Sequence, residues 1–142
     1  MLDKKIVNVV EHYLKLFPYI EQEIRELQED IEMPIHRDVN SFIQSKNKVS
    51  RMVENQAINN VQISEKISKC RKWQEIIEEV IERYRKNQVD RYLYMKLKYF
   101  KKYSINAIET ELTFGKTMQD RLRQDVVDYL ALFAVKENLI KL

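Results

Sequence analysis

The sequence predicts an all-α protein, and three of its features lead to that class. Leu, Ile, Glu, Lys, Gln and Arg dominate the 142 residues, a composition typical of helical proteins. One glycine and two prolines leave little material for the turns of β-hairpins. Apolar residues make up 44% of the chain and recur at the spacing of amphipathic helices. We therefore expect a helical chain with enough apolar surface for a core.

An N-terminal helical segment is expected over residues 1–33. Pro18 divides it, and since proline is tolerated in the first turn of a helix, a second helix is expected to begin there. That helix is expected to end near Met33, because the residue before a proline disfavours α geometry. The first helix, about 2–17, has an apolar face of Ile6, Val9, Val10, Tyr13, Leu14 and Phe17.

A polar and basic linker is expected over residues 34–55, followed by a long central helix over 56–87. The apolar periodicity fades in the linker, where Lys46, Lys48 and Arg51 form a small basic patch. We expect the central helix to pack on the N-terminal helices, on a second subunit, or on both, because a small C-terminal domain cannot cover its length. Its apolar stripe consists of Val61, Ile63, Ile67, Cys70, Trp73, Ile77, Val80, Ile81 and Tyr84.

The C-terminal domain, residues 88–142, is expected to begin with a basic helix over about 88–102. The stretch Arg91–Ser104 carries five cations and no anion, although the net charge of the whole chain is only +3. A local basic patch attracts polyanions, so we expect Lys101 and Lys102 to contact phosphates. A basic amphipathic helix with snorkelling lysines is the alternative. The expected buried face of this helix consists of Leu93, Leu97 and Phe100.

A helix-turn-helix is expected in the rest of this domain. Ser104 suits the N-cap of a helix over Ile105–Leu112. Gly115, the only glycine in the chain, is expected to form the turn, with a positive φ as one possibility. A longer helix follows from Lys116 to about Val135, and this order is that of a DNA-binding helix-turn-helix. The expected anchors of the longer helix are Met118, Leu122, Val126, Tyr129, Leu130 and Phe133.

The outer face of the longer helix predicts contacts to DNA. At about 100° per residue, a set of polar side chains falls opposite Met118 and Leu122. Such groups can reach base edges or phosphates when the apolar face of a recognition helix is anchored on its own domain. Arg121 lies to one side and is expected to reach the DNA backbone. The outer set consists of Lys116, Thr117, Asp120, Arg123 and Gln124.

Enzymatic, metal-dependent and membrane functions are not expected. Cys70 is the only cysteine, and neither His12 nor His36 stands at a zinc-ligand spacing from it, so no disulfide, metal site or cofactor is predicted. The chain lacks a glycine-rich phosphate loop and a nucleophile motif. Its apolar runs are far shorter than the ~20 residues of a membrane helix, and the N-terminus lacks the features of a signal peptide. We therefore expect a cytoplasmic protein.

The stretch YLYMKLKYFKKYSINAIETELTFGKTMQDRLRQDVVDYLALFA resembles the C-terminal part of phage late-gene transcriptional regulators of the RinA and ArpU type. That part is similar to the DNA-binding region 4 of sigma factors. Arg121 and Arg123 stand at the two-residue step of the family pattern. The other counterparts are Leu97, Tyr99 and Phe100 in the first helix, and Ile105, Ile108 and Leu112 in the second.

The resemblance implies a phage or prophage protein that binds a promoter and activates late genes. Double-stranded DNA is the implied partner, RNA polymerase is a further candidate, and the long central helix would hold a homodimer or a higher homo-oligomer. Two alternatives stay open. One is a phage terminase small subunit that binds the packaging site, and the other is a helical interaction module that contacts RNA polymerase without binding DNA.

Overall fold

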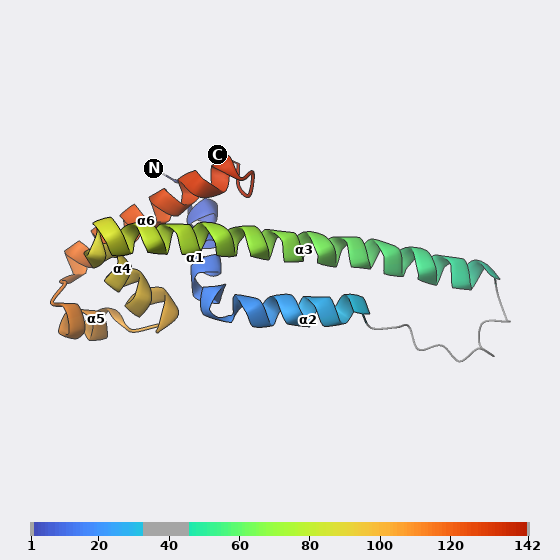
Figure 1. Ribbon diagram of the computed structural model, residues 1–142, viewed down its shortest axis with the longest axis horizontal. Coiled ribbons are helices and arrows are strands. Elements are labelled where there is room, and N and C mark those ends of the chain that lie inside the picture. The colour runs from blue at the N-terminus through green and yellow to red at the C-terminus, as the bar shows by residue number, and fades with distance from the viewer. Residues whose placement is uncertain (1, 33–45, 142) are drawn as a thin grey trace. The chain divides into compact units, whose positions relative to one another are not determined.

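The computed structural model describes residues 2–32 and 46–141, and every element within these ranges is helical (Figure 1). The expected all-α class is therefore confirmed for the described part of the chain. The chain divides into two compact units, one of Met1–Ile20 with Arg71–Leu142 and one of Glu21–Cys70.

Two helices form the N-terminal part, as the pattern around the proline predicts. Helix α1 spans Lys4–Leu16 and is capped by Asp3, whose carboxylate accepts a hydrogen bond from a backbone N–H of the first turn. A turn of 3-10 helix at Phe17–Tyr19 contains the proline, and α2 follows over Ile20–Glu32. Proline at the start of this turn costs no hydrogen bond, since the first N–H groups of a helix have no partner within it.

Helix α3 spans Lys46–Asn87 and begins ten residues earlier than predicted. Residues 46–55, assigned to the linker from their polar composition, are helical instead. Residues 46–55 contain no proline or glycine, so they lack the residues that most strongly break a helix. The remainder of the predicted linker, 34–45, and the side chains of its basic patch lie outside the described residues.

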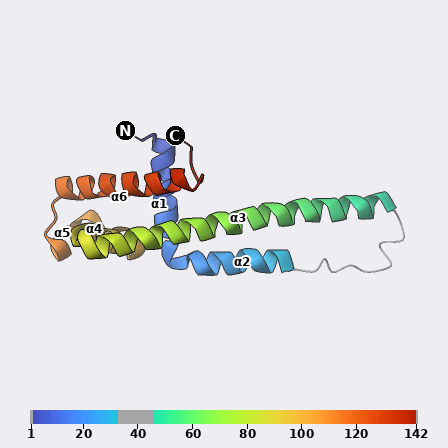
Figure 2. The ribbon, with the colours of Figure 1, turned by 45° about the horizontal axis from the view of Figure 1, so that its top comes forward.

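In the unit Glu21–Cys70, α2 runs alongside the part of α3 that leads up to Cys70 in both views, and the first turns of α3 extend beyond it (Figures 1 and 2). Ile24 and Cys70 are its buried apolar residues among those described. Burial raises the pKa of the Cys70 thiol, and the negative charge of Glu23 adds to that effect. The prediction that Cys70 is simply packed is therefore confirmed.

The other unit contains the C-terminal helices at nearly the predicted positions. Helix α4 spans Val89–Met95 and continues into a π-helical turn at Lys96–Phe100. Helix α5 spans Ile105–Leu112 and α6 spans Lys116–Lys136. The predicted cap is confirmed, since Oγ of Ser104 accepts a hydrogen bond from the backbone N–H of the third helical residue at 3.1 Å.

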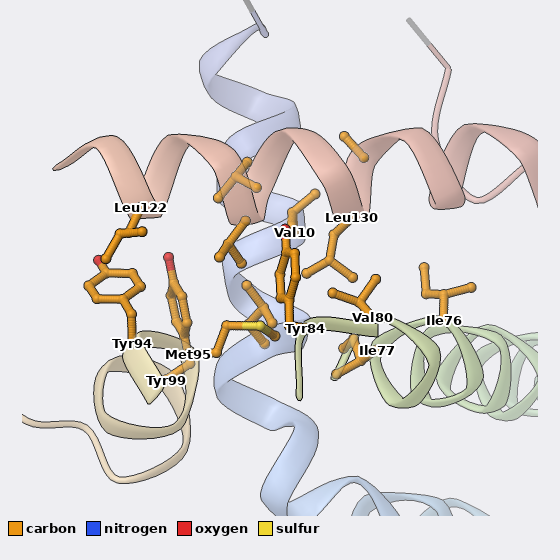
Figure 3. Close-up of a cluster of buried hydrophobic side chains, with 14 of the residues drawn as sticks. Val10, Ile76, Ile77, Val80, Tyr84, Tyr94, Met95, Tyr99, Leu122 and Leu130 are labelled. Atoms are coloured by element: carbon orange, nitrogen blue, oxygen red, sulfur yellow. The ribbon is translucent and has the colours of Figure 1, made fainter. Parts of the chain in front are cut away.

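The core of this unit lies where α1, α3, α4 and α6 meet (Figure 3). Tyr13 of α1 stacks on Trp73 of α3 with ring centroids 4.6 Å apart. The predicted stripe of α4 is shifted: Leu93 and Phe100 are only partly buried, and Tyr99 is fully buried. A π-helical turn adds a residue to the turn and so rotates the side chains in and after it, which accounts for Tyr99 and Phe100. Side chains of the cluster labelled in Figure 3 include Val10, Ile76, Ile77, Val80, Tyr84, Tyr94, Met95, Leu122 and Leu130.

Candidate nucleic-acid interface

The connection between α5 and α6 is a three-residue turn, and its left-handed residue is not the glycine. Thr113 has φ 58° and ψ 26°, whereas Gly115 has φ −67° and ψ 170° and is the N-cap of α6. The positive φ that was considered for Gly115 is therefore excluded. A Cβ added at this glycine would meet no described atom within 4 Å. The position of the only glycine marks the turn correctly, but the turn does not need a glycine there.

Gln119 fastens α6 to α5. Its side chain is buried, and its Nε2 donates to the carbonyl oxygens of Ile105 at 3.0 Å and Phe114 at 2.8 Å. Two carbonyl groups at the start of α5 and in the turn are thereby satisfied. The expected anchor Met118 is instead 39% exposed, so that prediction is wrong. The helix is rotated because the amide of its neighbour takes the inward position.

Helix α6 packs on two sides rather than one. Leu122, Val126 and Leu130 are buried. Figure 3 shows Leu122 and Leu130 on the side of α6 that faces the core. Val127, Ala131 and Ala134 are buried on the adjoining side, which widens the buried face. Both α1 and α4 contact α6. The open face is therefore narrower than the predicted one, and one of its edges borders α1.

Arg123 belongs to the edge that faces α1. Its Nε donates to Oε2 of Glu11 at 3.0 Å, and its Nη2 pairs with Oε1 of the same carboxylate. The hydroxyl of Tyr99 also donates to Glu11, at 2.8 Å. Burial alone would raise the pKa of Glu11, but the hydrogen bonds from Arg123 and Tyr99 and the positive charges of Arg123 and Lys15 outweigh it and lower that pKa. The expected outward position of Arg123 is thus corrected to a contact with α1.

Most of the other predicted residues are exposed, although Asp120 lies on the side of α6 that faces α1. Lys116, Thr117, Asp120, Arg121 and Gln124 are all exposed in the first half of the helix. At about 100° per residue, Arg121 lies near the middle of the open face, opposite the buried side chains. The sequence-based wheel placed Arg121 to one side and Arg123 outward, whereas in the structure Arg121 lies on the open face and Arg123 pairs with Glu11 of α1.

Two polar contacts border this face. Nε2 of Gln124 donates to Oδ1 of Asp128 at 3.0 Å. Arg91 of α4, at the start of the basic stretch, pairs with Asp125 at 2.8 Å. This pair links α4 to α6. Arg91, the first cation of the basic stretch that was expected to contact phosphates, is therefore already paired with a carboxylate.

A groove separates the start of α1 from the first half of α6, with a volume of about 350 Å³. We call it the α1–α6 groove. It is lined by Leu2, Lys4, Val7 and Asn8 of α1 and its preceding residues, and by Asp120, Arg123, Gln124 and Val127 of α6. The α6 side of the groove therefore carries three of the predicted DNA-contacting residues. The pattern of the sequence gave no indication that α1 would adjoin them.

Lys101 and Lys102 are not brought to the open face of α6. Both are exposed, and Nζ of Lys102 lies 5.1 Å from the ring centroid of Tyr19, just beyond α1. Tyr19 follows Glu11, which pairs with Arg123 of α6, by eight positions and lies beyond the end of α1. The two predicted parts of the interface are thus separated along α1.

The backbone of Lys102 is left-handed, with φ 57°, just after the end of the π-helical turn.

Sequence reasoning missed Glu11, Tyr99 and Gln119. Glu11 offered a signal, since it follows Val7 by four positions and precedes Leu14 by three, which places a carboxylate on the apolar face of α1. A buried carboxylate needs donors, so this position calls for a cation from another element. Which cation it receives depends on the packing of α1 against α6.

Comparison of the chain with protein families, with curated proteins and with solved structures finds no match in any of the three. Over the described residues, no group of His, Cys, Asp and Glu side chains is arranged to hold a metal ion. Within the same residues, none of the helices combines the length and the apolar character needed to cross a bilayer.

Proposed function

We propose that this protein binds double-stranded DNA through a helix-turn-helix formed by α5, residues 113–115 and α6. The observation that carries the proposal is the exposed polar face in the first half of α6, directly after the turn and opposite a continuous buried face. A recognition helix requires this division, because its inner side must be held by its own domain while its outer side reaches the DNA.

The side chains of this face suit the major groove. Arg121 can donate two hydrogen bonds to a guanine, the commonest specific contact in the groove. Gln124 can pair with an adenine, and its bond to Asp128 orients its amide. Lys116 and Thr117, at the start of the helix, are placed for the phosphate backbone. Arg121 is thus the leading candidate for base recognition.

The biological role that we propose is transcriptional regulation, as an activator of phage or prophage late genes in the bacterial cytoplasm. The support for this narrower role is the resemblance of residues 92–134 to such regulators and to sigma region 4. RNA polymerase is the protein partner that this role implies. A dimer is also implied, because two half-sites multiply the limited affinity of a single recognition helix.

The proposal is tested by selecting duplexes from a random-sequence library with the purified protein. We expect the wild type to enrich a motif and Arg121→Ala to lose preference at one or more positions of it. Arg25→Ala is the matched control, since it removes an exposed arginine of α2 outside the proposed interface. A wild-type protein that retains no duplex would refute DNA binding and would favour the interaction module.

The solution mass separates the regulator from the packaging protein. Ile58 and Val61 on α3 are 57% and 58% exposed, so self-association of this helix is a specific expectation. Light scattering that gives a dimer agrees with the regulator. A ring-sized assembly would instead support the terminase small subunit.

A further inference from the structure

We propose that the α1–α6 groove holds a phosphate of the DNA backbone, and that Lys4 and Asn8 of α1 extend the interface beyond the helix-turn-helix. This inference rests on the proposed DNA binding. The groove opens beside Gln124 and Asp120, at the edge of the open face of α6. A duplex lying against that face would bring one of its strands past the first turns of α1.

The donors in the groove match an acceptor-only ligand. Lys4 and Asn8 are exposed and make no side-chain hydrogen bond or ion pair with any described residue. Lysine and arginine offer only donors, and the oxygens of a phosphodiester only accept. The apolar lining of Leu2, Val7 and Val127 suits the CH groups of the adjoining sugar.

Arg123 contributes to the groove because Glu11 holds it in place. Its Nε and Nη2 are bonded to the carboxylate, while its Nη1 makes no hydrogen bond within the described part of the chain. The side chain is 48% exposed and lines the groove, so these remaining donors can meet a ligand. A guanidinium fixed in this way loses little conformational entropy on binding.

Removal of the Asp120 charge should change the affinity for DNA in the direction opposite to removal of the Lys4 charge. Asp120 is the one carboxylate that lines the groove, and it would repel a phosphate bound there. Asp120→Asn should therefore strengthen binding to DNA, whereas loss of the Lys4 charge should weaken it.

The test compares Lys4→Gln with Lys5→Gln. Lys5 is the next residue of α1, is also exposed and does not line the groove, so both variants lose the same charge from the same turn. The affinity of each protein for a mixed-sequence duplex is measured by fluorescence anisotropy over a series of salt concentrations. Phosphate contacts are independent of sequence, so no operator is needed.

We expect Lys4→Gln to bind about five- to tenfold more weakly at low salt and to lower the salt slope by about one, with Lys5→Gln close to the wild type. Asp120→Asn should bind more tightly. Equal effects of the two lysine variants, or weaker binding by Asp120→Asn, would overturn the groove contact and leave the helix-turn-helix proposal standing. A wild-type protein that binds no duplex would overturn both.

Discussion

The two parts of α3 belong to one continuous helix but bury their apolar side chains to very different extents. In Arg71–Asn87, five apolar or aromatic side chains are buried: Trp73, Ile76, Ile77, Val80 and Tyr84. In the part that ends at Cys70, that cysteine is the one buried apolar side chain among those described, while Ile58 and Val61 are more than half exposed. An apolar stripe thus predicts a helix and its inner face, but not whether another element covers that face.

The difference follows from what packs on each part. The part from Arg71 onward lies in the unit that also holds α1, α4 and α6, which meet around it in one core (Figure 3). The earlier part shares its unit with α2. Burial of apolar surface, at roughly 25 cal/mol per Å², is the main favourable term in folding, so we expect stability to be concentrated from Arg71 onward.

The largest predicted effect tests this comparison directly. Trp73→Ala should lower the free energy of unfolding by about 3–5 kcal/mol, because it removes a buried indole that also stacks on Tyr13. Ile58→Ala, in the other part of the helix, should change it by less than about 0.5 kcal/mol when the protein is dilute enough to be monomeric. Urea unfolding followed by circular dichroism measures both. Similar losses in the two variants would mean that the exposed part of α3 is covered in solution.

A smaller effect on stability is expected from the ion pair between Glu11 of α1 and Arg123 of α6. Glu11→Gln should cost about 1–2 kcal/mol at neutral pH, because the neutral amide loses the charge-assisted bonds to Arg123, which is half exposed. The lowered pKa of Glu11 means that folding favours the ionised carboxylate. Its contribution is complete above the ordinary pKa of a glutamate and is lost as the pH falls through the lowered value.

Unfolding curves at a series of acidic pH values check this sign. The difference in stability between the wild type and Glu11→Gln should shrink as the pH falls below the ordinary glutamate range. A difference that stays constant across that range would show that the carboxylate does not titrate with the fold.

The smallest effects concern the turn between α5 and α6, where the backbone rather than packing is at issue. Thr113→Gly should stabilise the protein by up to about 1 kcal/mol, because it relieves a left-handed conformation in a β-branched residue. Gly115→Ser should stabilise it by about 0.5 kcal/mol, because the serine hydroxyl can cap α6 and the site has room for it. Thermal unfolding of both variants measures the changes. A loss of stability in Gly115→Ser would contradict the conformation described for this turn.

Much of the helical layout follows from local chemistry. The cap at Ser104, the bounds of α5 and the start of α6 were predictable, because side-chain capping and helix-breaking residues act over a few positions. The early start of α3 was not predicted, since polar composition was taken for a linker although no helix-breaking residue is present. Periodicity is a weaker guide to the ends of helices than the residues that stop them.

The sequence by itself determined the helical class, the positions of the C-terminal helices and the polar character of the first half of α6. Only the tertiary structure decided which side of that helix faces outward, since the answer depends on Glu11 and Tyr99, residues far from α6 in the chain. The same holds for the α1–α6 groove, which joins residues more than a hundred positions apart. Local propensities act within a few residues, whereas burial and charge pairing are settled only when distant helices meet.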